Sequence, residues 1–281
     1  MRIIITGANG QLGQALQKVL QADHDLIPTD VPEFDITQPA IVQQFSDMRP
    51  ELIIHCAAMT DVEGCAKDPD TAFKINAFGT QNVAHACLRT NADMVHISTN
   101  EVFDGRSDIP YPEDAQPSPI NAYGSSKRAG EQMAANYVKD KLYIVRTAWL
   151  YGDNERMFPN KIIAAADKHG ELRVVTDEVS NPTYTPDLAD AIAQLIKTRA
   201  YGTYHFTNTG YCSRYDFAKE ILRLSERQHI PIRAITLAEY PRASNVPPFT
   251  PLINTRGPEI GIELRPWQDA LMAYFETVGT K

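Results

Sequence analysis

A glycine-rich turn close to the start of the chain limits most strongly what the sequence can form. A short apolar run, RIIIT, leads directly into TGANGQLG, in which Gly7, Gly10 and Gly13 stand three residues apart. Such glycines allow a tight turn, a close approach of the backbone to a pyrophosphate, and close packing of the next helix on the strand. The amides and the dipole at the start of that helix favour phosphate. Because the turn ends a predicted strand and begins a predicted helix, we predict dinucleotide binding here.

The same rhythm of short apolar and longer amphipathic segments continues through the first half of the chain. We predict strands at residues 2–6, 25–29, 51–56, 94–98 and 142–147, and helices at residues 11–22, 38–47, 70–89 and 125–139. Strands that alternate with helices form βαβ units, and their right-handed crossovers give a parallel sheet covered on both faces. The fold class is therefore α/β, with a doubly wound Rossmann-type sheet.

The second half has a different texture, with more prolines and polar turns. Helices are predicted at residues 158–169, 187–197, 213–227 and 266–275. We expect residues 1–150 to form an NAD(P)-binding Rossmann domain and residues 151–281 to form mainly a smaller substrate-binding lobe, with residues 185–200 packing back on the sheet. A ligand would lie between the two, outside the carboxyl ends of the strands.

Composition excludes several classes of protein. The formal charge of −8 argues against a nucleic-acid binder, and no apolar run is long enough to span a membrane. The N-terminal MRIIITGANG has no signal-peptide pattern, so a cytoplasmic protein is expected. The four cysteines form no C-x-x-C pair and the histidines have no ligand spacing, so we expect no metal site.

The end of the second strand bears on the choice of cofactor. Asp30 stands where a carboxylate would bind the ribose hydroxyls of a dinucleotide, and Val31, Pro32 and Glu33 follow it. A 2′-phosphate would meet a carboxylate and no neighbouring cation. NADH is therefore favoured, and NADPH stays open because a remote side chain such as Arg2 could compensate.

Three side chains suggest acid–base chemistry at the same edge of the sheet. Tyr123 and Lys127 are four residues apart, so they share one face of a helix. An ammonium group beside a phenol lowers its pKa from about 10 toward a useful range. Thr99 follows the predicted strand 94–98, where its hydroxyl could bind a substrate carbonyl. A tyrosine–lysine pair alone often arises by chance, and the preceding dinucleotide turn is what makes a catalytic interpretation the better one.

Five motifs together carry a family resemblance: TGANGQLG, HCAAMTDVE, STNEVFDG, YGSSKRAGE and RTAWLYG. With these motifs the chain resembles the extended short-chain dehydrogenase/reductases, and within them the dTDP-4-dehydrorhamnose reductases. The resemblance runs from residue 1 to about residue 190 and continues weakly to Tyr274. It implies reduction of the 4-keto group of a nucleotide-activated deoxysugar by NAD(P)H, in the synthesis of cell-surface polysaccharide sugars. The expected partners are that substrate and, in a homodimer, a second copy of the chain.

The resemblance also implies roles for individual residues. Thr99 would bind the substrate oxygen, Tyr123 would donate the proton, and Lys127 would also hold the nicotinamide ribose. The cofactor would contact Gly7, Asn9, Gly10, Gln11, Leu12, Gly13, Asp30, Asp35, Ile36, Ala57, Ala58 and Thr60. The sugar nucleotide would contact Trp149 and a loop that contains Asn181, Pro182 and Thr183.

Two departures from the family pattern leave the substrate open. Asn100 and Glu101 stand where the family usually has Asp-Tyr, and Val246 and Thr250 stand at the arginine and serine of an Arg-Pro-x-x-Ser-x-Leu segment. An arginine at that place could meet phosphate. Two alternatives therefore remain: a nucleotide-sugar epimerase or dehydratase on the same scaffold, and a regulatory subunit that binds NADP without catalysis, as in the methionine adenosyltransferase regulatory subunit.

Overall fold

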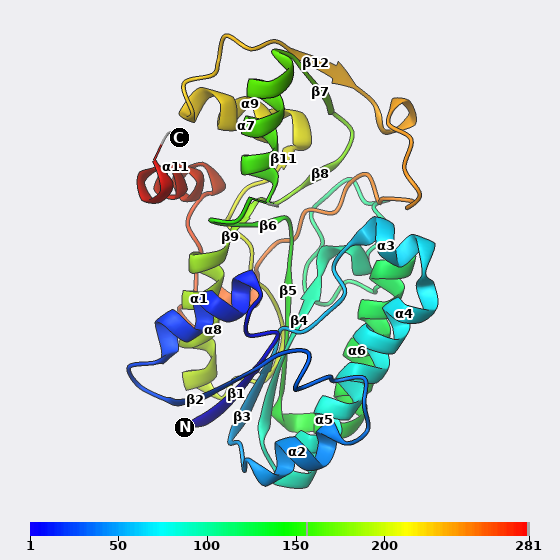
Figure 1. The fold of residues 1–281 in the computed structure, drawn as a ribbon, viewed down its shortest axis with the longest axis vertical. Helices are drawn as coiled ribbons and strands as arrows, with labels where there is room; N and C mark the ends of the chain where they lie inside the picture. Colours follow the sequence, from blue (N-terminus) through cyan, green and yellow to red (C-terminus); the bar gives the residue numbers. More distant parts are fainter. Residues whose placement is uncertain (156, 280–281) are drawn as a thin grey trace.

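The central feature of the computed structural model, which describes residues 1–155 and 157–279, is a parallel sheet (Figure 1). Its six strands lie in the order β10-β5-β4-β3-β1-β2. They are β1 (Arg2–Thr6), β2 (Asp25–Thr29), β3 (Leu52–His55), β4 (Asp93–Thr99), β5 (Leu142–Thr147) and β10 (Gly202–His205). This architecture confirms the predicted doubly wound α/β fold.

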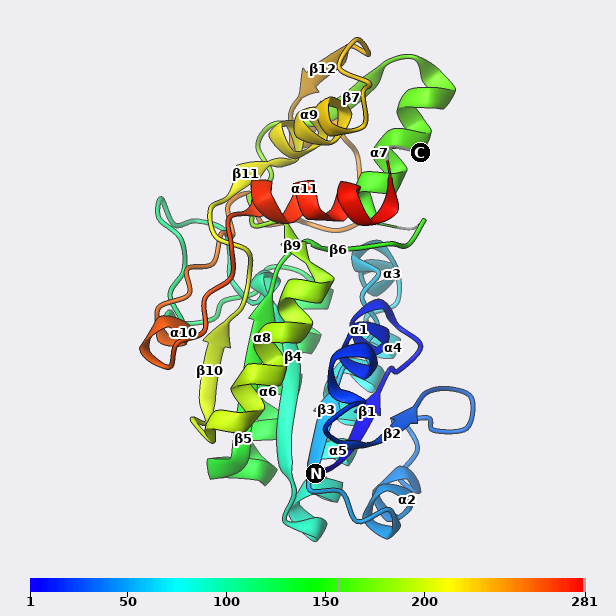
Figure 2. The same ribbon diagram turned by 90° about the vertical axis from the view of Figure 1, so that its left-hand side faces the viewer.

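Alternating side chains of the strands enter two separate cores. In β1, Ile3 and Ile5 belong to one apolar cluster, and Ile4 belongs to the other. Helices α1 (Gln11–Leu20) and α8 (Thr185–Thr198) cover the first face, and α2 (Ile41–Asp47), α5 (Thr80–Thr90) and α6 (Ala122–Val138) cover the second (Figures 1 and 2). A parallel sheet buried on both faces needs strands that are apolar on both sides, and RIIIT supplies such a strand.

Two features of this half differ from the sequence-based prediction. The predicted helix 70–89 is in fact α4 (Pro69–Phe73), a π-helical turn (Lys74–Gly79) and α5. Within that turn the Asn76 side chain accepts a hydrogen bond from the Met59 N–H at 2.8 Å and donates one to the Met59 carbonyl oxygen at 3.0 Å. These two bonds hold the π-helical turn against the chain after β3. The sixth strand, β10, was not predicted, because GTYH is short and half polar.

Apart from α8 and β10, most of the chain after β5 builds a lobe above the carboxyl edge of the sheet (Figure 1). Its strands are β6 (Leu150–Tyr151), β7 (Leu172–Val175), β8 (Val179–Ser180), β9 (Thr183–Tyr184), β11 (Cys212–Ser213) and β12 (Ile232–Ile235), and its helices include α7 (Phe158–His169), α9 (Arg214–Leu224) and α11 (Trp267–Val278). Aromatic rings fill its core, among them Tyr151, Phe217 and Tyr274. The remaining short elements are α3 (Val62–Lys67), α10 (Arg256–Glu259) and single 3₁₀ turns at Asn100–Val102, Lys139–Lys141 and Leu237–Glu239.

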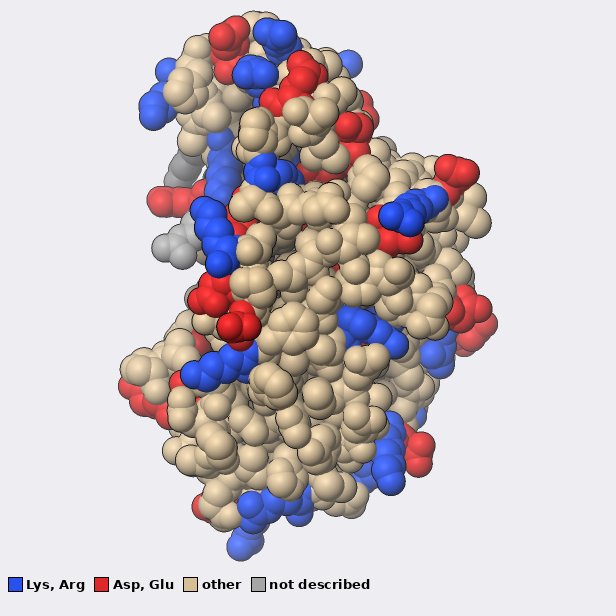
Figure 3. All heavy atoms as spheres, turned by 90° about the vertical axis from the view of Figure 1, so that its right-hand side faces the viewer, with Lys and Arg blue, Asp and Glu red and all other residues tan. Residues whose placement is uncertain are grey.

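The side of the molecule formed by α3, α4, α5 and α6 carries few charges. Figure 3 shows charged side chains mostly around its margins, with uncharged atoms over its middle. Phe78 and Leu88, from the π-helical turn and α5, are 54% and 55% exposed. Among the residues that the structure describes, no helix has the length and apolarity needed to cross a membrane.

Candidate active site

A cavity of about 860 Å³ lies between the carboxyl edge of the sheet and the C-terminal lobe. Its position follows from register, since Thr99 at the end of β4 pairs with Thr147 at the end of β5, and the six strands of the central sheet are all parallel. Among the residues predicted from the sequence, the lining includes Gly7, Gly10, Gln11, Leu12, Gly13, Asp30, Asp35, Ile36, Ala57, Ala58, Thr60, Thr99, Tyr123, Lys127 and Trp149. Asn9, Asn181 and Thr183 are not part of this lining.

The glycine turn has the shape that a dinucleotide requires. Gly7 has a φ of +64°, and a Cβ there would lie 2.8 Å from the Ala57 nitrogen. A Cβ on Gly13 would clash with the carbonyl oxygen of Gly7. No side chain caps α1, so its first amides face the cavity without an intramolecular side-chain partner. Side chains at these glycines would push the turn away from the end of β3 and α1 away from the turn.

Two polar side chains with buried, unpaired atoms also indicate that the cavity binds a polar ligand such as a dinucleotide. The amide nitrogen and oxygen of Gln11 and the hydroxyl of Thr147 have no hydrogen-bond partner among the described residues, and both residues line the cavity. Buried polar groups normally find partners, so those that face a cavity indicate a polar ligand. Thr147 was not predicted, because a threonine at a strand end gives no signal of its own.

At the far end of the cavity, acidic side chains organise the loops after β2. The Asp30 carboxylate accepts hydrogen bonds from the backbone N–H groups of Asn9 and Val31, both at 2.8 Å. Asp35 accepts one from the backbone of Thr37 at 2.9 Å, which is the main reason that its pKa is lowered. Lys74 also lines the cavity, and its charge contributes to the same shift. It was missed because no motif surrounds it in the sequence.

Arg2 does not reach this end of the cavity. It begins β1 at the opposite edge of the sheet, where its guanidinium pairs with Asp25 at 2.8 Å. The suggestion that Arg2 could compensate for a missing cation is therefore wrong.

The tyrosine and lysine sit in the first turns of α6, directly beside the end of β4. Asn121 caps the helix by accepting a hydrogen bond from the Gly124 N–H at 2.8 Å. A Cβ on Gly124 would clash with the carbonyl oxygen of Glu101, so glycine at this position allows the first turn of α6 to rest on the chain after Thr99. This contact brings Thr99, Tyr123 and Lys127 to one wall of the cavity.

The electrostatics of this wall differ from the sequence-based expectation. The Lys127 ammonium donates a hydrogen bond to the carbonyl oxygen of Ile97 at 2.6 Å, and burial lowers its pKa to about 8. Burial, followed by the charge of Glu101, raises the pKa of Tyr123, while a hydrogen bond with Thr99 lowers it. The predicted lowering by Lys127 is not found in this structure, in which burial and the charge of Glu101 determine the direction of the Tyr123 pKa shift. A phenol with a raised pKa keeps its proton at neutral pH, but it is a weaker acid than one whose pKa lies near the working pH.

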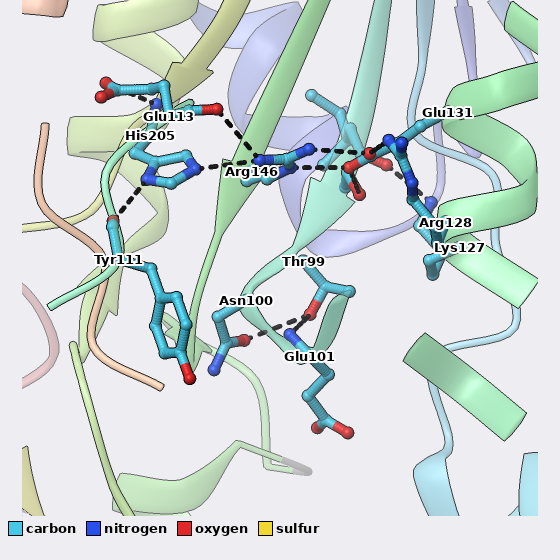
Figure 4. A network of polar contacts seen from close by, with 12 residues as sticks. Thr99, Asn100, Glu101, Tyr111, Glu113, Lys127, Arg128, Glu131, Arg146 and His205 are labelled. Carbon is cyan, nitrogen blue, oxygen red and sulfur yellow. Dashed lines mark hydrogen bonds and ion pairs between the residues drawn. The ribbon is translucent and has the colours of Figure 1, made fainter. Parts of the chain in front are cut away.

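The two departures from the family pattern meet in the structure, because Asn100 of the first contacts Thr250 of the second. Asn100 donates hydrogen bonds to the hydroxyls of Thr250 at 2.7 Å and Ser180 at 3.1 Å, and it lies beside Thr99 (Figure 4). These bonds join the end of β4 to the C-terminal lobe. Glu101 lines the cavity and accepts a hydrogen bond from Asn121 at 2.7 Å, and burial raises its pKa to about 7.

The residues predicted to contact substrate fall into two groups. The Trp149 ring lines the cavity, and the guanidinium of Arg214 lies over it at 3.6 Å. Asn181 is buried and binds the backbone of Gly210 and Leu252, each at 2.7 Å, and Thr183 is fully buried in β9. Those two side chains hold the loops of the lobe in this structure, and their contact with a substrate stays a prediction.

No metal centre is evident in the part of the chain that the structure describes. Within residues 1–155 and 157–279, no group of three or more His, Cys, Asp or Glu side chains is arranged to hold an ion.

The dinucleotide turn and the tyrosine–lysine pair open into one cavity, a combination shared by nicotinamide-dependent oxidoreductases of the extended short-chain type. The chain is an enzyme of this class. Residues 1–279 match the family described as RmlD substrate binding domain, and the chain belongs to that family.

Relatives and solved structures agree with this assignment. The chain is 36% identical over 277 residues to the spore coat polysaccharide biosynthesis protein SpsK of Bacillus subtilis, covering 98% of this chain and 97% of SpsK. A dTDP-4-dehydrorhamnose reductase from Clostridium acetobutylicum superposes with a TM-score of 0.95 at 41% identity, over 99% of both chains. The Bacillus anthracis enzyme of that name, in complex with NADP, has a TM-score of 0.94 at 40% identity, over 98% of this chain and 99% of that one.

Proposed function

We propose that this protein reduces the 4-keto group of a dTDP-activated 6-deoxysugar with a nicotinamide cofactor, as a step in the synthesis of polysaccharide sugars. The observation that carries the proposal is the meeting of Thr99, Tyr123 and Lys127 in the cavity that the glycine turn also lines. Relatives named dTDP-4-dehydrorhamnose reductase and dTDP-4-keto-6-deoxy-D-glucose reductase support the choice of substrate.

In this proposal each side chain of the site has one task. The cofactor, when bound, supplies a hydride for the ketone carbon. Tyr123 donates its phenolic proton to the ketone oxygen, and the Thr99 hydroxyl donates a hydrogen bond to that oxygen as negative charge develops. Lys127 holds the nicotinamide ribose, and the Trp149 ring packs against the sugar. Residues 1–150 with 185–200 would act as the cofactor domain, and most of residues 151–281 as the substrate lobe.

The test is an assay of dTDP-4-keto-6-deoxysugars with NADH and with NADPH, in which cofactor oxidation is followed and the stereochemistry at C4 is read by NMR. We expect stoichiometric oxidation of the cofactor and formation of a 4-hydroxy product. Turnover without added reductant, by protein that carries tightly bound NAD, would instead identify an epimerase or dehydratase. Failure of every ketosugar, together with co-purification of another enzyme, would identify a regulatory subunit.

The cofactor preference is a separate part of the proposal. The carboxylate of Asp30 opposes a 2′-phosphate and favours NADH, whereas Lys74 lines the same end of the cavity and offers a cation. We therefore propose that both cofactors are used. Lys74→Gln should raise the KM for NADPH by about 10-fold, the usual scale for one charged hydrogen bond, and change the KM for NADH less than two-fold. Equal effects on both cofactors would show that Lys74 does not meet the phosphate.

A homodimer in the cytoplasm completes the proposal. The sparsely charged side of α5 and its exposed Leu88 offer a surface for a second copy (Figure 3). The four free cysteines are those expected in a reducing compartment. Sedimentation of the full chain would test the assembly.

A further inference from the structure

Arg214 is the cationic residue that the C-terminal lobe contributes to the cavity. It begins α9 and lines the cavity together with Trp149. Its guanidinium carbon lies 3.6 Å from the centre of the Trp149 ring and 4.9 Å from that of Phe158. Its Nε donates a hydrogen bond to Glu178 at 2.9 Å. The two rings and the carboxylate together fix the plane of the guanidinium.

Most donors of this guanidinium are not used by the residues that the structure describes. Of its five N–H donors, the hydrogen bonds found among residues 1–155 and 157–279 use only the one on Nε. The side chain is 21% exposed, and Arg214 lines the cavity. A planar fork of this kind, held in place and with free donors, matches the paired oxygens of a phosphate group.

Glu178 contacts Arg214 through one of its two carboxylate oxygens. The other oxygen of the Glu178 carboxylate pairs with Arg242 at 3.2 Å, and Arg242 in turn pairs with Glu63 at 3.0 Å. The four side chains therefore alternate in charge, and Glu178 divides its two oxygens between Arg214 and Arg242.

The other cations of the cavity are placed for the cofactor. Among the described lining residues, the basic side chains are Lys74, Lys127 and Arg214. Lys127 is bound to Ile97 beside Tyr123, and the charge of Lys74 acts on Asp35 at the far end. Arg214 is thus the basic side chain available to an anion that enters from the lobe.

We propose that Arg214 binds the diphosphate of the sugar nucleotide, and that its stack on Trp149 sets the distance between the diphosphate and the sugar. This inference rests on the proposed function and identifies the residue that recognises the anionic part of its substrate. It also explains how the chain can bind such a substrate with Val246 at the position where the family pattern has arginine.

The test measures binding of thymidine diphosphate, with no need for turnover. In Arg214→Gln we expect the Kd for thymidine diphosphate, measured by calorimetry, to rise about 10- to 100-fold, as for loss of hydrogen bonds to a charged group. The Kd for thymidine, which lacks phosphate, and the Kd for NADPH should change less than two-fold. Unchanged NADPH binding also reports that the variant is folded. Arg214→Lys keeps the charge without the fork and should give an intermediate loss.

Arg223→Gln is the matched control, because Arg223 lies on the same helix, is exposed and pairs only with Glu220 among the described residues. It should leave all these constants unchanged. In turnover, Arg214→Gln should raise the KM for the ketosugar nucleotide with little change in kcat, since the contact persists through the reaction. If the unaltered protein reduces the substrate and Arg214→Gln binds thymidine diphosphate equally well, this inference alone is wrong. If the unaltered protein neither reduces ketosugars nor binds thymidine diphosphate, both proposals are wrong.

Discussion

Replacing Tyr123 with phenylalanine should lower kcat for ketone reduction by about 10²- to 10⁴-fold, the usual contribution of a general acid. The raised pKa of Tyr123 and its hydrogen bond with Thr99 describe a protonated phenol at the wall of the cavity. Phenylalanine keeps the ring and its packing but removes the proton that the ketone oxygen needs. The measurement is the single-turnover rate of NADPH oxidation at saturating ketosugar.

Cofactor binding separates this chemical effect from damage to the fold. The Kd for NADPH should stay within about three-fold, because phenylalanine preserves the shape of the wall. Tyr137→Phe is the control, since Tyr137 lies on the same helix and its hydroxyl accepts a hydrogen bond from Gln81 at 2.9 Å, away from the cavity lining. That variant should retain full activity. A Tyr123→Phe enzyme with more than a tenth of the original kcat would exclude Tyr123 as the proton donor.

Local pattern was sufficient to predict the sheet and one wall of the cavity. RIIIT alternates its isoleucines between two cores, and such strands fix a parallel sheet before any contact is known. Once the sheet is parallel, Gly7 and Thr99 must lie at the same edge, because Gly7 directly follows β1 and Thr99 ends β4. The helix that carries Tyr123 follows β4, so its first turn also meets that edge.

Features that depend on contacts between residues distant in the sequence could not be predicted from local pattern. Arg214 enters the cavity only because α9 folds over Trp149, and no spacing links those two residues along the chain. The direction of the Tyr123 pKa shift depends on burial and on Glu101, whereas the helical spacing to Lys127 suggested the opposite direction. Strand β10 could not be predicted for the same reason, since the polar residues of GTYH are stabilised by partners distant in the sequence.

One such partnership lies directly behind the active site (Figure 4). Arg146 of β5 and Glu131 of α6 pair through two hydrogen bonds, at 2.8 and 2.9 Å, and their side chains are 4% and 0% exposed. The same carboxylate accepts the Ser98 hydroxyl at 2.6 Å. Glu131 therefore ties the helix that carries Lys127 to the strand that ends in Thr99.

Arg146→Met should lower the free energy of unfolding by about 3–5 kcal/mol, because it leaves the buried Glu131 carboxylate without its main partner. For a chain of this size that corresponds to a fall in Tm of about 5–8 °C. Arg128→Met is the control. Arg128 also pairs with Glu131, at 2.7 Å, but its side chain is 27% exposed, so the loss should stay below about 1 kcal/mol.

The pH dependence of the stability of Arg146→Met tests whether the unpaired Glu131 carboxylate causes the loss. Burial raises the pKa of Glu131, but the hydrogen bonds and charge of Arg146 bring it below its usual value. A lowered pKa contributes stability that is present above the unfolded value of about 4.3 and is lost as the pH falls through the folded value. In Arg146→Met burial would dominate and the pKa of Glu131 would rise. The loss of unfolding free energy should therefore be largest near pH 7 and shrink toward about pH 4 as Glu131 becomes protonated.

Denaturant unfolding of this variant at several pH values measures the loss, and the double variant Glu131→Gln/Arg146→Met should recover part of it at neutral pH. A deficit that is independent of pH, or a double variant no more stable than Arg146→Met, would point to packing around the Arg146 side chain instead.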